Sequence, residues 1–331
     1  MVHVAFVIDP ITTFNVKKDS TLAMIRAAQT RGWRTTVLGP HDLALQHGQV
    51  MAWSRDIVLT PDAMRSLDAI DGPDYYRLGP EARLPLAAMD LVMMRKDPPF
   101  DMEYVYATYL LERAEREGAT VVNAPKSLRD CNEKFFATDF PACTPPLIVA
   151  ARQDLLLNFH GEHRDVVFKK LDGMGGMSIF RIREDDPNLR VVIETLTDNG
   201  RRPIMAQKFI PEISAGDKRI LLIDGEAVPY ALARVPMRGE SRGNLAAGGA
   251  GVGQALSDRD RAIAEAVGGT LRERGLRFVG IDVIGDYLTE INVTCPTCIR
   301  ELDRQFDLDI AGSLLDSLQA TMSRGARSAL T

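Results

Sequence analysis

A glycine-rich turn between two short strands constrains the fold of this chain more than any other feature. The turn spans residues 172–178 and reads Asp-Gly-Met-Gly-Gly-Met-Ser, between an apolar stretch at 165–170 and a second strand-like stretch at 179–182. Glycines at three of four positions let the backbone approach a phosphate closely and direct N–H groups at it. A tight hairpin turn without a ligand has the same pattern. Because no Gly-Lys-Ser/Thr and no helix follow, the turn fits neither a Walker loop nor a Rossmann fingerprint.

Short apolar strands alternate with helices before this turn. Strands are expected at 2–8, 34–38, 91–94 and 120–123, and helices at about 20–31 and 101–117. Strands that alternate with helices predict a parallel sheet with helices on its faces. The stretch 49–59 alternates only weakly, and residues 61–85 are expected to be mostly loop.

A chain of 331 residues is too long for one ordinary domain, and its predicted elements fall into three segments and a tail. The predicted domains are an N-terminal domain at 1–124, a second unit at 125–203, a third at 204–323 and a tail at 324–331. In the second unit, Ser127 is expected to cap a helix that runs through Phe140.

The third unit is expected to hold several strands, a small-residue loop and two helices. Residues 236–253 are rich in glycine and other small residues and are interpreted as a mobile loop. The other elements are strands at 204–210, 219–223, 227–235, 278–284 and 288–293, and helices at about 257–274 and 309–323.

Charge and apolar content exclude several classes of partner. The formal net charge of −5 disfavours nucleic acid or an anionic membrane as the main partner. No run approaches the roughly 18 apolar residues of a membrane span, and the first apolar run, 4–8, is too short for a signal sequence. A cytoplasmic protein with reduced cysteines is therefore expected. A zinc site would need Cys295 and Cys298 to meet His160 and His163, and nothing in their order suggests this.

Two lysines are candidates for phosphate binding. Lys169 lies on the strand that leads into the glycine turn, and Lys134 lies in the helix expected to start at Ser127. A lysine ammonium is a compact charge suited to phosphate. Either lysine alone is equally explained as a surface residue, but Lys169 interrupts an otherwise apolar strand.

An acidic hairpin near the C-terminus is a candidate magnesium site. Glu290 and Asn292 are two residues apart on one strand and share a face, and Asp282 lies on the preceding strand. Hard oxygen ligands of this kind suit Mg²⁺, which is often shared with nucleotide phosphates. A two-residue turn at 285–286 would set Thr289 opposite Asp282, whereas a three-residue loop at 285–287 would set Glu290 there. Only the second register gathers the three ligands, and a solvent-facing polar edge is the competing interpretation.

Arginines form the last group of candidates. Arginine binds carboxylates and phosphoryl groups through two hydrogen bonds. Arg242 lies in the small-residue loop, which resembles a lid over a reactive intermediate, although a disordered loop with incidental charge would have the same sequence. Arg95 ends a strand of the first sheet, where ligands of open sheets bind, although an ion pair with Asp97 or Asp101 would also explain it. The other candidates are Arg219 and Arg234.

The order of these features resembles the ATP-grasp fold and, more narrowly, bacterial-type glutathione synthetases. The resemblance covers nearly the whole chain except its C-terminal tail. It rests on the stretches 94–100 (Met-Arg-Lys-Asp-Pro-Pro-Phe), 127–134 (Ser-Leu-Arg-Asp-Cys-Asn-Glu-Lys), 171–176, 241–249 and 289–294 (Thr-Glu-Ile-Asn-Val-Thr). Two departures are Lys170, where the family commonly has proline, and Cys295, where serine is expected.

The resemblance implies a fold and a reaction. The expected architecture is α/β and α+β, with an N-terminal Rossmann-like (pre-ATP-grasp) parallel sheet domain before a two-subdomain ATP-grasp fold. The implied activity is that of an ATP-dependent carbon–nitrogen ligase that joins γ-glutamylcysteine and glycine through an acyl phosphate, giving glutathione, ADP and phosphate. Mg²⁺ or Mn²⁺ as cofactor and a homotetramer are also implied.

The resemblance assigns a role to each candidate residue. Arg95 and Asn244 would bind the substrate, and Asp282, Glu290 and Asn292 would hold the metal. Arg219, Arg234 and Arg242 would surround the reacting carboxylate. The residues assigned to ATP are Lys134, Lys169, Gly173, Met174, Gly175, Gly176, Gln207, Lys208, Phe209, Ile210 and Asp217.

Two alternatives share these features. Another ATP-grasp ligase, acting on D-alanine or glutamate, would use the same nucleotide site with a different purpose for Arg95 and the loop at 11–19. A regulatory module that binds nucleotide without turnover would need no lid over an intermediate. ATP turnover that requires both co-substrates separates the three hypotheses.

Overall fold

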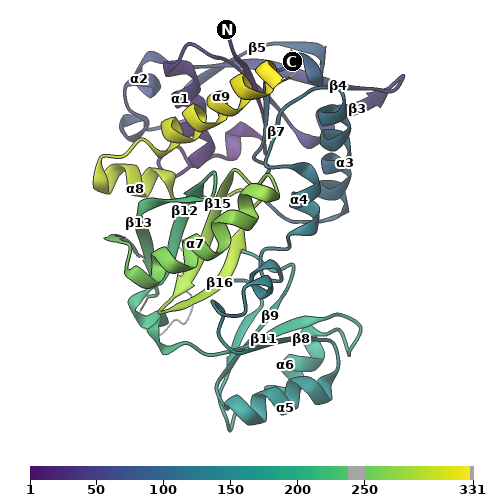
Figure 1. The fold of residues 1–331 in the computed structure, drawn as a ribbon, viewed down its shortest axis with the longest axis vertical. Helices are drawn as coiled ribbons and strands as arrows, with labels where there is room; N and C mark the ends of the chain where they lie inside the picture. Colours follow the sequence, from purple (N-terminus) through teal and green to yellow (C-terminus); the bar gives the residue numbers. More distant parts are fainter. Residues whose placement is uncertain (238–249, 329–331) are drawn as a thin grey trace.

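Three β-sheets with flanking helices form the computed structural model, which describes residues 1–237 and 250–328. Figure 1 shows the N-terminal sheet at one end of the long axis, the sheet of β12, β13, β15 and β16 in the middle, and the sheet of β8, β9 and β11 at the other end. The mixed α/β architecture agrees with the fold class predicted from the sequence.

The N-terminal sheet has a parallel centre and an antiparallel side. Its strand order is β3-β4-β2-β1-β6-β7, with β5 paired to β4. Strands β1, β2, β6 and β7 run parallel, as the alternating pattern predicted. The strands are β1 (His3–Val7), β2 (Arg34–Leu38), β3 (Leu43–Gln46), β4 (Gln49–Leu59), β5 (Tyr76–Pro85), β6 (Leu91–Met94) and β7 (Val121–Val122).

The prediction of a loop at 61–85 was wrong. This stretch contains α2 (Pro61–Arg65) and the ten-residue strand β5. Glycine and proline within β5 weaken its local preference for a strand. Its strand conformation comes from antiparallel pairing along β4, a contact between distant residues that local patterns do not report.

Helices of the N-terminal region begin where the sequence predicted. Asp19 caps α1 (Ser20–Thr30) by accepting the Leu22 N–H, and Asp101 caps α3 (Met102–Arg116) by accepting the Tyr104 N–H. Short 3₁₀ turns lie at Ile11–Thr13, Pro40–Asp42, Leu67–Ala69, Leu86–Ala88, Phe136–Asp139 and Pro211–Ala215.

The helix predicted from Ser127 to Phe140 is shorter than expected. Helix α4 spans Pro125–Asp130, and a separate 3₁₀ turn follows at Phe136–Asp139. The Asn132 side-chain oxygen accepts the N–H groups of Lys134 and Phe135, so a local side-chain contact replaces helix hydrogen bonds. Lys134 therefore lies in a turn and not in a helix.

The second sheet carries the glycine turn. Its order is β10-β9-β11-β8, and the turn joins β9 (Val166–Lys170) to β10 (Ile179–Ile182) as a strand–turn–strand unit. Helices α5 (Gln153–His163) and α6 (Leu189–Leu196) pack on this sheet through a separate apolar core that includes Leu156, Phe168 and Ile193. The remaining strands are β8 (Leu147–Ala150) and β11 (Ile204–Lys208).

The third sheet is antiparallel and carries the acidic hairpin. Its order is β14-β13-β12-β15-β16. Helix α7 (Asp258–Glu273) lies where a helix was predicted and packs against β13, and Ser257 caps it. The strands are β12 (Asp217–Ile223), β13 (Glu226–Val235), β14 (Ala250–Ala255), β15 (Phe278–Ile284) and β16 (Tyr287–Asn292).

Part of the predicted mobile loop is a strand. Residues 250–255 form β14 on β13, and residues 238–249 lie outside the described residues. A Cβ atom at Gly253 would come within 2.3 Å of the Phe306 ring, so this glycine permits close packing. The small residues here thus reflect contact with α8 (Ile299–Phe306), a helix that the sequence analysis did not predict.

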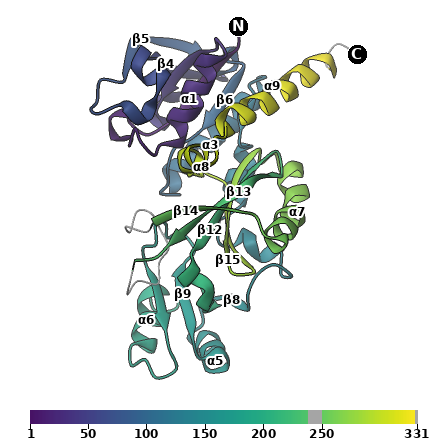
Figure 2. The ribbon, with the colours of Figure 1, turned by 90° about the vertical axis from the view of Figure 1, so that its left-hand side faces the viewer.

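The C-terminal helices return to the N-terminal sheet (Figure 2). Helix α9 (Ile310–Ser328) packs beside α1, and its residues Leu314 and Leu318 are buried. It extends beyond the predicted end at residue 323. None of the helices in residues 1–237 and 250–328 has the length and apolar character needed to cross a membrane.

Candidate active site between the second and third sheets

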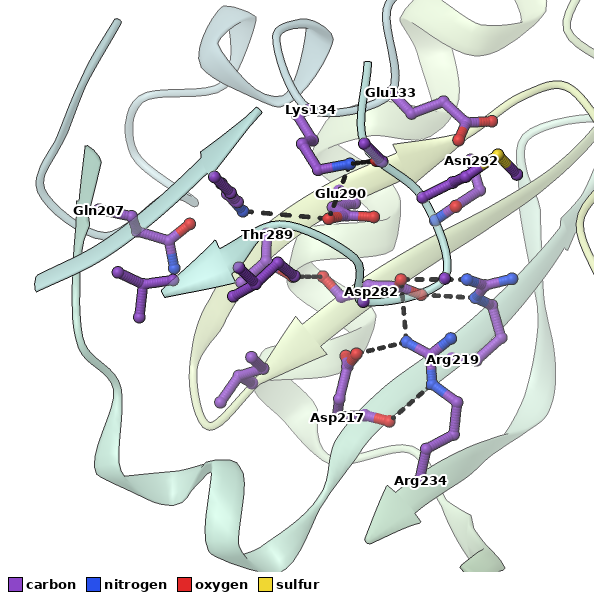
Figure 3. A pocket seen from close by; sticks show the side chains of 18 of the residues that line it. Glu133, Lys134, Gln207, Asp217, Arg219, Arg234, Asp282, Thr289, Glu290 and Asn292 are labelled. Carbon is purple, nitrogen blue, oxygen red and sulfur yellow. Dashed lines mark hydrogen bonds and ion pairs between the residues drawn. The ribbon is translucent and has the colours of Figure 1, made fainter. Parts of the chain in front are cut away.

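A cavity of about 290 Å³ opens between the glycine-turn sheet and the acidic-hairpin sheet. One wall comes from β9, the glycine turn and β11, and the other from β12, β13, β15 and β16 (Figure 3). The cavity brings together most of the predicted site residues. These are Lys134, Lys169, Gly173, Met174, Gly175, Gly176, Gln207, Phe209, Ile210, Asp217, Arg219, Arg234, Asp282, Glu290 and Asn292.

The two predicted lysines converge on one carboxylate. The Nζ atoms of Lys134 and Lys169 lie 3.5 and 4.0 Å from Glu290 Oε1. Lys134 also donates to the Gly173 carbonyl oxygen, which ties it to the glycine turn. Burial lowers the pKa of Lys169, and the nearby Lys134 charge adds to this, whereas Glu290 opposes it. Two buried ammonium groups beside glycine backbone are suited to bind an anion such as a polyphosphate.

The acidic hairpin combines features of both predicted registers. Gly285 and Asp286 form a two-residue turn, yet Asp282 lies opposite Glu290. The two are compatible because Thr289 is an extra residue in β16, a β-bulge that shifts the register by one. The Thr289 hydroxyl donates to the Asp282 carbonyl oxygen over 3.1 Å. The bulge directs Asp282, Glu290 and Asn292 to the cavity, as the three-residue loop was predicted to do.

A network of two arginines and two aspartates lies on β12, β13 and β15. Arg219 Nε lies 2.5 Å from Asp282 Oδ1, and Arg219 Nη2 lies 3.0 Å from Oδ2. Arg234 Nη2 bridges Asp282 Oδ2 at 2.9 Å and Asp217 Oδ2 at 2.5 Å. Figure 3 shows the Asp282 carboxylate in contact with both guanidinium groups.

The network sets different proton affinities for its two carboxyl groups. Burial alone would raise the pKa of Asp282, but the Arg219 and Arg234 charges hold it well below its ordinary value. Burial raises the pKa of Asp217 to about 6, with the Asp282 and Glu290 charges adding to the effect and Arg234 opposing it. Asp217 Oδ1 is buried without a hydrogen bond.

The opposite end of the cavity is lined by Gln207, Phe209 and Ile210 on and after β11. Gln207 Oε1 is buried without a hydrogen-bond partner and can accept one from a ligand. Lys208, which was predicted beside them, has an exposed side chain and does not line the cavity. Arg181, which was not predicted, lies 3.4 Å from the Phe209 ring centroid and binds both Asp165 oxygens.

A divalent cation fits the acidic hairpin. No cluster of three or more His, Cys, Asp and Glu residues suited to a metal occurs in the described part of the chain, so the set depends on the Asn292 oxygen. The Asn292 amide nitrogen is buried without a hydrogen-bond partner among the described residues, so no hydrogen bond from this nitrogen fixes the orientation of the amide beside Asp282 and Glu290. Two carboxylates and an amide oxygen form a partial set of hard ligands of the kind that Mg²⁺ completes with water and phosphate.

The structure does not bring every predicted substrate or catalytic residue into the cavity. Arg95 is buried but does not line the cavity, because its guanidinium donates to Thr21 Oγ1 at 3.2 Å and to the Pro296 carbonyl at 3.0 Å. The alternative of an ion pair with Asp97 or Asp101 is not found among the described contacts of Arg95. Arg242 and Asn244 lie outside the described residues.

The cavity also contains residues to which the sequence analysis gave no role in binding or catalysis. Cys295 lines it, and burial raises the pKa of its thiol to about 12. Cys298 is buried, and all four cysteines are free. Glu133 lines the cavity next to Lys134. Its position directly before a predicted phosphate ligand, in a stretch that carries the family resemblance, was an available signal, although a lone acidic residue has no motif of its own.

Comparisons with known proteins agree with this architecture. The N-terminal domain model of prokaryotic glutathione synthetase matches residues 2–129, and the ATP-grasp domain model of the same family matches residues 133–307. A glutathione synthetase from Pseudomonas aeruginosa is 58% identical over 322 residues, covering 97% of this chain and 99% of the relative. One from Pseudomonas putida is 56% identical, covering 96% of this chain and 97% of the relative.

Solved structures support the fold alone. A D-cycloserine synthetase is 15% identical with a TM-score of 0.65, covering 97% of this chain and 99% of that chain. The ATP-grasp ligase PsnB in complex with a minimal precursor is 16% identical with a TM-score of 0.62, and the shares covered are again 97% and 99%. The full-length identity and both family models lead to one conclusion: the chain belongs to the prokaryotic glutathione synthetases, which are ATP-grasp ligases.

Proposed function

We propose that the cavity joins γ-glutamylcysteine to glycine at the expense of ATP, releasing glutathione, ADP and phosphate. The observation that carries the proposal is the convergence of two buried lysines, a glycine turn and a paired arginine network on one cavity. A binding module needs a nucleotide site but not a second set of arginines. The arginines are explained if a carboxylate must approach the terminal phosphate.

The nucleotide is proposed to extend along the cavity from β11 to the lysines. Gln207, Phe209 and Ile210 would contact the base, Asp217 would lie near the ribose, and Lys134 and Lys169 would hold the phosphates under the glycine turn. Lys208 is the weakest member of this set, because its side chain is exposed outside the cavity and only its backbone could contribute.

Arg219 and Arg234 are proposed to orient the cysteinyl carboxylate for attack on the terminal phosphoryl group. Their guanidinium groups are held in place by Asp282 and Asp217, so they are preorganised and need little rearrangement as charge develops. We also propose that Arg242 lies beside the reacting carboxylate. The dipeptide is proposed to bind to Arg95 and Asn244.

Asp282, Glu290 and Asn292 are proposed to hold Mg²⁺ or Mn²⁺. When bound, the metal supplies charge neutralisation on the transferring phosphoryl group. The acyl phosphate must be shielded from water, because hydrolysis would destroy it before the glycine amine attacks.

We also propose that the protein is a cytoplasmic homotetramer divided into domains at 1–124, 125–203 and 204–323, with a tail at 324–331. Four free thiols are compatible with a reducing compartment. Exposed Met102, Tyr106 and Tyr109 on α3 offer an apolar surface for self-association. Sedimentation equilibrium tests the tetramer, and limited proteolysis tests the boundaries.

The function is tested by ADP release with ATP and Mg²⁺, adding γ-glutamylcysteine and glycine separately and together. Release that requires both, with glutathione as product, supports the proposal. Replacing the dipeptide by D-alanine or glutamate is the matched control for the other ligase hypotheses. Equal turnover with such a substitute, or no turnover with the dipeptide and glycine, would refute the assignment.

A further inference from the structure

Glu133 is anchored to the end of β16 by an unusual number of contacts. Its Oε1 atom accepts hydrogen bonds from the Val293 N–H at 3.0 Å, the Thr294 N–H at 3.1 Å and the Thr294 hydroxyl at 2.8 Å. Its backbone carbonyl accepts the Ile291 N–H at 2.8 Å. The carboxylate is therefore fixed in direction immediately beyond Asn292.

The second carboxylate oxygen of Glu133 is not used in this anchoring. Glu133 lines the cavity, and among the described residues no donor is recorded within hydrogen-bond distance of Oε2. Figure 3 shows Glu133 and Gln207 at opposite ends of the site, with Glu290 between them. Glu133 thus lies on the far side of Glu290 from the proposed base-binding residues, and the proposed nucleotide orientation leaves that end to the other two substrates.

The surroundings of Glu133 favour proton acceptance. Burial raises the pKa of the Glu133 carboxyl, the Thr294 hydrogen bonds oppose this, the Glu290 charge raises it further and Lys134 lowers it. The Tyr104 phenol of α3 also interacts with the Glu133 carboxylate, and its hydroxyl is buried without a partner. A carboxylate that is fixed, partly desolvated and open to the cavity has the properties of a general base.

The reaction needs such a group because an amino acid binds with its amine protonated, and an ammonium cannot attack. In the part of the chain that the structure describes, the other carboxylates around the lysines are already engaged: Asp217 and Asp282 are held by arginines, and Glu290 faces both lysines. Asp97 lines the cavity too, but it lies on the exposed loop after β6.

We propose that Glu133 binds the ammonium group of the incoming amino acid and takes one of its protons, so that the neutral amine attacks the acyl phosphate. This inference rests on the proposed function. The nitrogen forms a bond to the carbonyl carbon, and the carbon–oxygen bond to phosphate breaks with its electron pair leaving on phosphate. A second proton moves from nitrogen to the departing phosphate, and Glu133 returns its proton to solvent.

The test separates base catalysis from anchoring by changing the nucleophile. Glu133→Gln keeps an amide oxygen that can accept the Val293 and Thr294 hydrogen bonds but removes the base. Hydroxylamine is uncharged at neutral pH, captures acyl phosphates as hydroxamates and needs no deprotonation by the enzyme. With ATP, Mg²⁺ and γ-glutamylcysteine present, the turnover number is measured at saturating glycine and at saturating hydroxylamine.

The expected result for Glu133→Gln is a loss of about 10²- to 10⁴-fold with glycine, the usual contribution of a general base, and less than about threefold with hydroxylamine. Glu133→Asp, which retains a carboxylate one methylene shorter, should recover part of the glycine rate. Glu115→Gln is the matched control, because Glu115 is a half-buried carboxylate on α3 outside the cavity, and both rates should be unchanged.

Equal losses with both nucleophiles would overturn the proposal and make Glu133 an anchor only. Unchanged glycine turnover would overturn it as well. If Glu133→Gln does not fold, Glu133→Asp decides alone: the proposal requires the glycine rate to fall more than the hydroxylamine rate. Failure of the proposed function is distinguishable, because the wild-type protein would then release ADP with neither nucleophile.

Discussion

Replacing Lys169 by methionine tests the nucleotide site most directly, because its neighbour supplies a matched control. Successive side chains of a strand point to opposite faces. On β9, Lys169 is 5% exposed and lines the cavity, whereas Lys170 is half-buried, does not line it and interacts with Asp198 instead. Lys169→Met and Lys170→Met therefore remove the same charge from adjacent residues, only one of which faces the proposed phosphates.

The size of the effect follows from the contact that is lost. A hydrogen bond to a charged group contributes about 1.5–3 kcal/mol, which corresponds to about 10- to 150-fold in a dissociation constant. Lys134 remains beside Glu290, so Lys169→Met should weaken ADP binding within this range without abolishing it. Lys170→Met should change it by less than about twofold.

Isothermal titration calorimetry with ADP and Mg²⁺ measures both constants. Equal weakening in the two variants would show a general charge effect, and unchanged binding in Lys169→Met would remove this lysine from the phosphate site. Either result refutes the reasoning from strand alternation.

Stability without nucleotide gives an independent check on the same variant. Because burial lowers the pKa of Lys169 in the folded state, the unfolded chain binds this proton more tightly, and the charge destabilises the fold at neutral pH. Lys169→Met should therefore melt no lower than the wild type at pH 7. The difference in melting temperature between Lys169→Met and the wild type should become smaller as the pH rises from the lowered folded-state pKa towards the ordinary lysine value. A difference that stays constant or grows over this range would contradict the reasoning.

Three further predictions follow from particular contacts. The Asn123 amide donates to the Phe278 and Val293 carbonyl oxygens and accepts the Arg277 and Phe278 N–H groups, all near the acidic hairpin. Asn123→Ala should therefore lower the free energy of unfolding, measured in urea, by about 2–4 kcal/mol. A change below about 1 kcal/mol would refute this. Burial raises the pKa of Glu115 to about 7, so its contribution to stability is lost as the pH rises from about 4.5 through 7, and Glu115→Gln should reduce the fall in melting temperature between pH 5 and 8. Chelating divalent metal should stop ADP release, and Glu290→Gln should raise the Mg²⁺ concentration for half-maximal rate at least tenfold; an unchanged Mg²⁺ requirement would remove Glu290 from the proposed ligand set.

Local patterns predicted the elements that depend on neighbouring residues. The starts of α1, α3 and α7 were predictable because the side chains that cap them, Asp19, Asp101 and Ser257, each bond an N–H only three residues away. The parallel centre of the N-terminal sheet followed from alternation, and the position of Lys169 followed from its polar side chain in an apolar strand.

Features that depend on distant residues were missed or misread. Strand β5 exists through β4, and β14 exists through β13 and α8. The hairpin register could not be decided from loop length, because the bulge at Thr289 restores the pairing of Asp282 with Glu290 that a two-residue turn alone would prevent. Glu133 was overlooked because its partners, Val293 and Thr294, are about 160 residues away.

Two lysines and two arginines lie in the same cavity, and in the absence of substrate their positive charges are compensated by carboxylates. Lys134 and Lys169 share Glu290, while Arg219 and Arg234 share Asp282. The two pairings differ in geometry: the arginine contacts are 2.5–3.0 Å, and that of Arg219 is bidentate, whereas the lysine contacts are 3.5 and 4.0 Å. Phosphates can therefore take over the lysines from Glu290 more readily than a substrate can take the arginines from Asp282. If the lysines hold phosphate as proposed, Glu290 becomes available to the proposed metal, and we therefore predict that nucleotide and metal each strengthen the binding of the other.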